Sequence, residues 1–308
     1  MDNMGNMRNA YGETLVALGK EDKRIVDLEA DLGKSTMGAM FEAAIPERFF
    51  EMGIAEADMA GAAAGLAFAG KIPFFGSFAV FSSGRCYDQI RTGIAIAGLN
   101  VKICGSSAGL SDYGDGATHQ SIDDISLMRV LPHMSVFAPA DAIQTKKIVE
   151  YMAKNEGPMY IRLDRNPVPN VTDPDEEFVP GKLYQMRDGS DITIFAHGFM
   201  VARSLEAAEI LAAQGKSVRV VNVPSIKPID KDQVAELANG VNMVVEEHSI
   251  YGGLGDVICA VLAEKKPAFV RKYGINDMFG CSAMNYFELL EEYGFTGEKI
   301  AAAAAELL

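Results

Sequence analysis

The chain has 308 residues, of which 49% are hydrophobic and 23% charged, and its net charge at pH 7 is −14. This composition is that of a globular protein large enough for two domains. The negative charge argues against a nucleic-acid-binding surface, which needs clustered Lys and Arg. The longest apolar run, residues 59–69, is too short to cross a membrane.

The N-terminus is polar and lacks the apolar core of a signal peptide. The four cysteines show no C-x-x-C spacing, which argues against a redox or zinc motif. We therefore expect a cytoplasmic protein whose thiols are reduced.

Helical and strand patterns alternate in the first half of the chain. Helices are predicted at 6–18, 59–69, 84–97, 121–130 and 141–153, and strands at 24–31, 101–107, 134–140 and 158–164. This alternation is typical of a mainly parallel sheet with helices on both faces.

A proline-rich, acidic stretch separates this half from a second alternating region. Here strands are predicted at 191–198, 217–224, 241–248 and 267–274, and helices at 199–214, 230–239, 252–264 and 283–292. The tail, residues 301–308, has a helical composition but no assigned role. We predict an α/β protein with two domains, residues 1–168 and 185–308, joined by a linker at 169–184.

Three loops that follow predicted strands are polar and contain glycine. They are EADLGKST at 29–36, GSSAGLSDYGDGATHQ at 105–120 and RLDRNP at 162–167. Ligands of open parallel sheets bind beyond the carboxyl ends of the strands, so we expect the functional site among these loops.

Glu56 lies at the edge of a segment made almost wholly of Ala, Gly, Met, Leu and Phe. Such surroundings disfavour the ionised form of a carboxyl group, so this acid could be meant to stay protonated. It could equally be a first-turn glutamate favoured by the helix dipole, because Asp58 follows two residues later. The two interpretations are compatible, and the residues alone do not choose between them.

His119 lies in a glycine-rich loop with Asp115 and Gln120, just before a predicted helix. The start of a helix favours a neutral, hydrogen-bonding imidazole, whereas a flexible loop with a structural His is the alternative. The triplet at 114–116, GDG, would suggest a diphosphate–magnesium loop if an Asn ligand followed closely. The next Asn is Asn155, at the end of a helix, so we predict no metal ligand in this chain.

Two further features could bind a ligand. Arg165 follows a strand end and could clamp a phosphate group, because a guanidinium matches phosphate oxygens bidentately. Pairing with Asp164 at the surface is the alternative. Phe78 and Phe81 precede a turn, where they could pack in the core or stack on a flat heterocycle.

Taken together, these segments resemble the C-terminal half of transketolase, a thiamine-diphosphate enzyme. The resemblance rests on GIAEADMAGAAAGLAFAG, GDGATHQSIDDISLMRVLPHMSVFAPAD and RLDRNP, which occur in the order and spacing of the family. It runs from about residue 24 to the end. It implies the pyrimidine-binding domain and the C-terminal domain of that family, without the domain that binds the diphosphate and its metal.

The resemblance also implies roles at the cofactor. Glu56 matches the glutamate that hydrogen-bonds the aminopyrimidine ring, promotes its imino tautomer and so allows the ylid to form. Phe81 or Phe78 would stack on the pyrimidine, and Asp31 would also contact the cofactor. His119 would be a second catalytic residue.

At the substrate end, residues match family positions that bind sugar hydroxyls and phosphate. These residues are Ser35, Ser107, Asp115, His119 and Arg165. Ser107 stands where many transketolases have a second histidine, and Gly114 where many have a glutamate. Both departures leave room for a donor or acceptor other than the usual pentose and heptose phosphates.

The resemblance therefore implies a split transketolase subunit that transfers a two-carbon ketol unit from a ketose phosphate to an aldose phosphate through a thiamine-diphosphate ylid. An N-terminal partner subunit would hold most of the Mg²⁺ or Ca²⁺ site, in an α2β2 heterotetramer. Alternatives are the β subunit of a 2-oxoacid dehydrogenase, a deoxyxylulose phosphate synthase and a non-catalytic α/β binding module.

Overall fold

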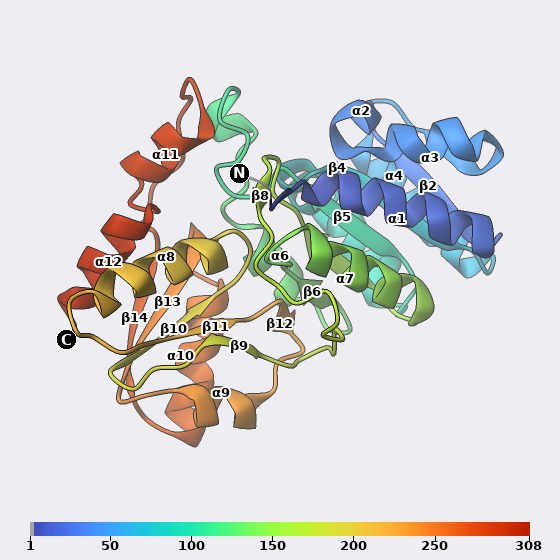
Figure 1. The fold of residues 1–308 in the computed structure, drawn as a ribbon. Coiled ribbons are helices and arrows are strands. Elements are labelled where there is room, and N and C mark those ends of the chain that lie inside the picture. The colour runs from blue at the N-terminus through green and yellow to red at the C-terminus, as the bar shows by residue number, and fades with distance from the viewer. Residues whose placement is uncertain (1–2) are drawn as a thin grey trace.

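Two large sheets and a two-stranded sheet organise residues 3–308, the part of the chain that the computed structural model describes (Figure 1). The two-stranded sheet pairs β1 (Met4–Gly5) with β8 (Val168–Pro169). The first sheet contains, in spatial order, β12 (Ser225–Lys227), β6 (Ser135–Phe137), β7 (Met159–Arg162), β5 (Lys102–Ser106), β4 (Ile72–Phe78), β2 (Ile25–Glu29) and β3 (Phe49–Glu51). The second contains β14 (Phe269–Ile275), β13 (Val241–Ser249), β10 (Ile192–Ala196), β11 (Val218–Asn222) and β9 (Tyr184–Arg187). Within the two large sheets, neighbouring strands are parallel except β12 with β6 and β9 with β11, which confirms the predicted α/β fold.

Helices cover both faces of the first sheet. One face carries α1 (Met7–Glu21), α3 (Gly38–Ala44) and α7 (Ala142–Lys154), and the other carries α4 (Glu56–Phe68) and α6 (Asp124–Arg129). The neighbours Phe74 and Phe75 are both fully buried, but in different hydrophobic clusters. Successive side chains of a strand point to opposite faces, so one aromatic pair anchors both helix layers.

The second sheet is covered in the same way. α8 (Met200–Ala212) and α12 (Gly297–Ala305) lie on one face, and α9 (Lys231–Leu237) and α10 (Leu254–Lys265) on the other. Residues 301–305 of the tail, for which no role was expected, thus belong to α12, where Ile300, Ala301 and Ala304 are buried. Small side chains let two helices approach closely, which explains the alanine run.

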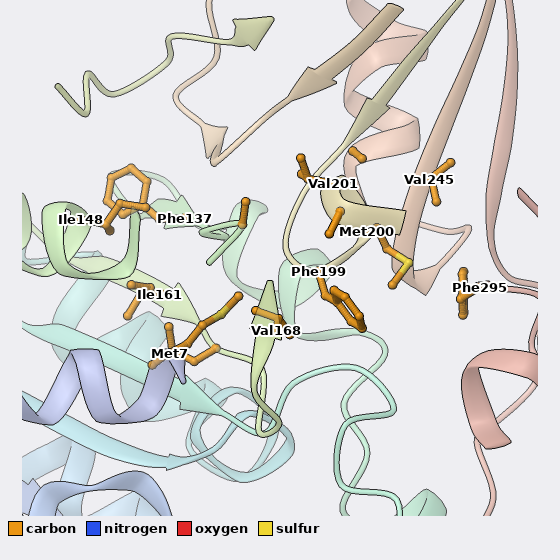
Figure 2. Packing of buried hydrophobic residues seen from close by; sticks show 14 of the residues in the cluster. Met7, Phe137, Ile148, Ile161, Val168, Phe199, Met200, Val201, Val245 and Phe295 are labelled. Atoms are coloured by element: carbon orange, nitrogen blue, oxygen red, sulfur yellow. The ribbon is translucent and has the colours of Figure 1, made fainter. Parts of the chain in front are cut away.

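The two halves are joined by more than the connecting chain. Strand β12 belongs to the second half in sequence but pairs with β6 of the first sheet. Figure 2 shows Met7, Ile161 and Val168 of the first half in the hydrophobic cluster that also contains Phe199 and Met200 of the second. The core therefore continues across the boundary between the halves.

One predicted helix, at 84–97, takes a different form. The segments Phe81–Arg85 and Ile90–Ala95 are π-helical, with only the short α5 (Tyr87–Gln89) between them. Side-chain hydrogen bonds compete for backbone carbonyl groups here, because Ser83 Oγ donates to Ala79 O and Thr92 Oγ1 donates to Asp88 O. π-Helical turns frequently occur at functional sites. No helix within residues 3–308 is long and apolar enough to span a membrane.

Candidate active site

The candidate residues lie at one edge of the first sheet. Asp31 and Ser35 follow β2, Phe81 follows β4, Ser107 follows β5 and Arg165 follows β7. Because these strands are parallel, their carboxyl ends share an edge, which is where such sheets bind ligands.

Glu56 is the first residue of α4 and its side chain is only 5% exposed. The apolar surroundings expected from the sequence are incomplete, because Arg85 Nη1 donates to Glu56 Oε1 at 2.7 Å. The Arg85 guanidinium also lies over the Phe81 ring, with Cζ 3.8 Å from its centre, and its side chain is 49% exposed. The site thus presents a buried carboxyl group beside an aromatic face, with a planar N–H-bearing group held against both.

Phe78 and Phe81 form a stacked pair with ring centres 6.0 Å apart and an angle of 18° between the rings. Both are buried. His119 meets the two rings edge-on, with its ring centre 5.2 Å from that of Phe81 and 6.1 Å from that of Phe78. The glycine-rich loop therefore brings its histidine against the aromatic pair.

His119 does not stand at the start of a helix, contrary to the prediction. It follows a 3₁₀ turn at Gly116–Thr118, and α6 begins only at Asp124. Its Nδ1 is 2.9 Å from Thr118 Oγ1. The half-buried His119 ring is therefore in contact with a neighbouring hydroxyl group and does not lie at the end of a helix dipole.

Arg165 pairs with a different acid from the one expected. Its Nη1 donates to Asp112 Oδ2 at 2.7 Å, and its Cζ lies 5.7 Å from the centre of the Phe78 ring. Asp164, the sequence neighbour, accepts instead from Asn166 N–H. Burial raises the pKa of Asp112, although the Arg165 guanidinium opposes that effect.

Arg8 is a candidate that the sequence reasoning missed. It lies in α1, and its Nη1 donates to the backbone oxygen of Ser35 at 2.6 Å. Burial and the nearby Arg165 guanidinium lower the pKa of Arg8, so two cations converge here. An isolated arginine in an amphipathic helix has no local sequence signal that could reveal this contact.

The remaining candidates are placed by unusual backbone. Asp31 has φ 59° and its N–H donates to Glu51 Oε1, while its side chain is exposed. Ser107 has φ 54°, and its buried hydroxyl has no hydrogen-bond partner within the described chain. Asp115 is exposed and adds to the negative charge near Asp112. Strained positive-φ residues of this kind cluster at functional sites.

A buried carboxyl group holds the loop that carries Asp31 and Ser35. Glu29 is fully buried, and its Oε1 accepts from Thr36 Oγ1 at 2.5 Å. A Cβ on Gly38 would lie 2.2 Å from the same oxygen, so glycine is required there. No group of three or more His, Cys, Asp or Glu within residues 3–308 is arranged to hold a metal ion.

Chemically, the site offers a carboxyl group and an aromatic face for a flat nitrogen heterocycle. Next to them, two guanidinium groups and a histidine suit an anionic, hydroxyl-bearing molecule. These features come from five separate segments of the chain.

Both halves of the chain are similar to known proteins. The family model for the transketolase pyrimidine-binding domain matches residues 4–170, and that for the transketolase C-terminal domain matches residues 181–300. The chain is 40% identical over 303 residues to the 6-deoxy-6-sulfo-D-fructose transketolase subunit SqwH of Clostridium sp., covering 98% of this chain and 94% of that one. It is 37% identical over 310 residues to an apulose-4-phosphate transketolase subunit of Phocaeicola vulgatus, covering 100% and 99%.

A solved structure is also similar. It is described as a split-gene transketolase, an inactive β4 tetramer, and it shares 48% identity and a TM-score of 0.88 over 98% of this chain and 97% of that one. Matches of this extent cover both halves of the fold and the edge of the sheet where the candidate residues lie. The chain therefore belongs to the transketolase family.

Proposed function

We propose that this chain is the C-terminal subunit of a split transketolase, which transfers a two-carbon ketol unit from a ketose phosphate to an aldose phosphate. The two relatives described above are named as transketolase subunits, and this chain covers almost the full length of each. We take residues 1–168 as the pyrimidine-binding domain and residues 185–308 as the C-terminal domain, with 169–184 as the linker.

The contact between Arg85, Phe81 and Glu56 is the observation that carries this proposal. The guanidinium is planar, lies on the Phe81 ring and donates an N–H to the Glu56 carboxyl group. An aminopyrimidine is also planar and bears nitrogen groups at its edge, so these residues fit the pyrimidine of thiamine diphosphate. Arg85 is half exposed and can turn toward solvent when that ring binds.

Roles for this chain's residues follow from that fit. Glu56 would hold a proton at a ring nitrogen. Phe81 would stack on the ring, because the guanidinium that lies over Phe81 also bonds to Glu56, whereas Phe78 is the ring that lies near Arg165. Asp31 is the remaining candidate contact. When bound, thiamine diphosphate supplies the electron sink for the ketol fragment.

At the substrate end, Arg165 and Arg8 would hold the anionic group of the sugar, next to Ser35. Hydroxyl groups of the sugar would bind a second set of residues, namely Ser107, Asp115 and His119. One relative is named for a sulfo sugar and the other for a sugar phosphate, and both substrates carry an oxyanion that suits a guanidinium. The clamp is thus compatible with either anion.

We further propose an N-terminal partner subunit that binds the diphosphate and most of the Mg²⁺ or Ca²⁺ site, in an α2β2 assembly. The similar split-gene transketolase structure supports this, because its β4 tetramer is described as inactive.

The test is reconstitution. The chain alone and the chain with the diphosphate-binding subunit of the same organism are each assayed for ketol transfer, with magnesium and thiamine diphosphate. We expect turnover only in the mixture, and tight cofactor binding by calorimetry only there. Turnover by the chain alone, comparable to that of an intact transketolase, would contradict a split enzyme. A mixture that binds the cofactor but transfers no ketol unit would contradict the proposed reaction.

A further inference from the structure

We propose that Tyr286, in the C-terminal half, is a positioning residue that fixes Arg165 and the loop 109–112 by bridging two buried carboxyl groups. Tyr286 is the first residue of α11 (Tyr286–Glu292). The inference rests on the proposed role of Arg165 and goes beyond it, since it gives the C-terminal half a part in the site.

The bridge consists of one hydroxyl group between two acids. Tyr286 Oη lies 2.5 Å from Glu247 Oε2 and 3.0 Å from Asp164 Oδ2, and all three side chains are buried. A phenol has one proton to donate. If it donates to one carboxylate, the other carboxyl group must itself carry a proton to bond to the phenol oxygen. The cluster is therefore complete only when the two acids together hold one proton.

The second carboxyl oxygen of each acid accepts a hydrogen bond from the backbone near Arg165. Asp164 Oδ1 accepts from the Asn166 N–H at 2.7 Å, and Glu247 Oε1 accepts from the Leu110 N–H at 2.5 Å. At Gly109, φ is 66° and a Cβ would lie 2.5 Å from Glu247 Oε1. The loop can approach Glu247 so closely only because this residue is glycine.

The same loop holds Arg165. Ser111 Oγ accepts from the Arg165 N–H at 3.2 Å, and Asn166 Nδ2 donates to Ser111 O at 3.0 Å. Asp112 pairs with the Arg165 guanidinium. The hydrogen bonds therefore form a closed ring in which Tyr286 bonds to both acids and both acids are linked to the loop 109–112. Arg165 is attached to this ring through Ser111 and Asp112.

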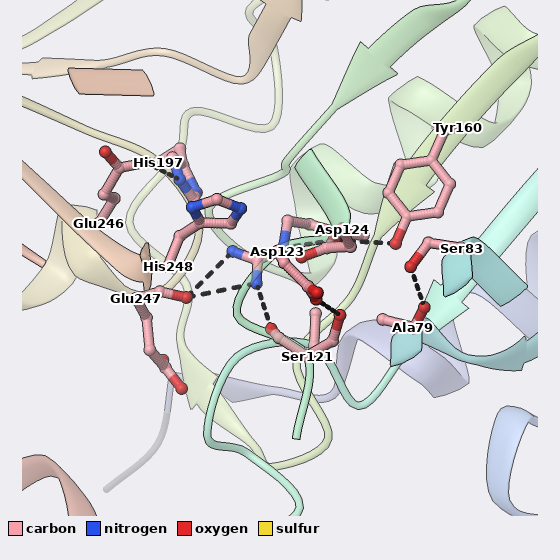
Figure 3. Close-up of polar contacts among 12 residues, drawn as sticks. Ala79, Ser83, Ser121, Asp123, Asp124, Tyr160, His197, Glu246, Glu247 and His248 are labelled. Atoms are coloured by element: carbon pink, nitrogen blue, oxygen red, sulfur yellow. Dashed lines mark hydrogen bonds and ion pairs between the residues drawn. The ribbon is translucent and has the colours of Figure 1, made fainter. Parts of the chain in front are cut away.

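The surroundings support a shared proton. Burial and the neighbouring Asp164 raise the pKa of Glu247 to about 8, and burial raises the pKa of Asp164 to about 6. The cations that face the pair are Arg162 of β7 and Arg8 of α1. Figure 3 shows Glu247 near Ser121 and His248, where Arg162 bonds to the Glu247 backbone oxygen. Burial thus favours one proton shared by the pair at neutral pH, and Glu247 is the more readily protonated of the two acids.

Tyr286→Phe tests the proposal, because it removes only the bridging hydroxyl. We expect the amide hydrogens of Leu110 and Asn166 to exchange about tenfold faster, which corresponds to one lost hydrogen bond, while amides of α8 stay unchanged. In the reconstituted complex, KM for a phosphorylated donor should rise about tenfold and kcat should change less. Tyr273→Phe is the matched control, because its hydroxyl bonds to Gly294 O in the same half, away from the site.

Glu247→Gln keeps the test decisive if Tyr286→Phe fails to fold. The amide oxygen still accepts from Leu110 and the side chain mimics the neutral acid, so amide exchange and KM at pH 7 should match the wild type. In Glu247→Ala, by contrast, the Leu110 amide should exchange faster and KM should rise. Unchanged exchange in Tyr286→Phe, equal effects in Tyr273→Phe, or loss of Leu110 protection in Glu247→Gln would each overturn the proposal. Because exchange is measured on the chain itself, its result stands even if the complex shows no ketol transfer.

Discussion

Replacement of Arg165 by alanine should weaken the binding of phosphorylated substrates while leaving cofactor binding intact. The Arg165 side chain is 32% exposed, and one N–H bonds to Asp112. A guanidinium has five N–H donors, so several remain for a substrate. Its aromatic contact is with Phe78, whereas Arg85, which bonds to Glu56, lies over Phe81.

The magnitude follows from these contacts. Charge-assisted hydrogen bonds contribute about 1.5–3 kcal/mol, which corresponds to roughly ten- to a hundredfold in KM. Arg8 stays in place and keeps one positive charge at the site, so we expect the lower end, about tenfold. The Asp112 side chain is only 3% exposed, so the loss of its ion pair with Arg165 should also cost about 1–3 kcal/mol of stability.

The assay compares one ketose with and without its phosphate group in the reconstituted complex. KM should rise for the phosphorylated form and hardly change for the other. Arg187→Ala is the control, because Arg187 pairs with Glu209 on the second half of the chain. Equal losses for both substrates would show a structural arginine, and no loss for either would refute a role in anion binding. A selective loss for a sulfonated sugar instead would identify that anion as the ligand.

Three further changes have defined outcomes. Glu56→Gln keeps an acceptor for Arg85 but removes the acid, so proton exchange at the thiazolium carbon, followed by NMR in the complex, should slow by roughly 10²–10⁴-fold; unchanged exchange would leave Glu56 as a helix-start residue only. Burial lowers the pKa of Lys102 to about 7 from 10.5, so the folded chain binds fewer protons than the unfolded chain between these pH values. Its free energy of unfolding should therefore rise with pH there by on the order of 1 kcal/mol per pH unit relative to Lys102→Met, and parallel urea-unfolding profiles would contradict this. Thr36→Val leaves the buried Glu29 carboxyl group without its partner and should lower the free energy of unfolding by about 1–3 kcal/mol, whereas Thr92→Val, at an exposed hydroxyl, should be nearly neutral.

Much of the architecture could be predicted because burial imposes a period on the sequence. The alternating strand and helix patterns indicated a parallel sheet covered on both faces, and most predicted strands lie where expected. The central strand β4 was missed, because its aromatic residues were interpreted only as a core or stacking cluster. Two other differences concern elements whose form depends on contacts elsewhere. Strand β12 pairs with a sheet formed mainly by the other half, and the expected helix at 84–97 became π-helical.

The candidate residues could be named from the sequence, since polar side chains and glycines after parallel strands indicate a ligand site and their order resembled a known family. Their partners could not be predicted. Arg85 is 29 positions from Glu56, Asp112 is 53 from Arg165, and Tyr286 is 122 from Asp164. Sequence patterns report which residues are buried and how the local backbone runs. Only the tertiary structure decides which charged side chains lie close together, because that depends on how separate strands and loops pack. The same packing determines which acids keep their protons.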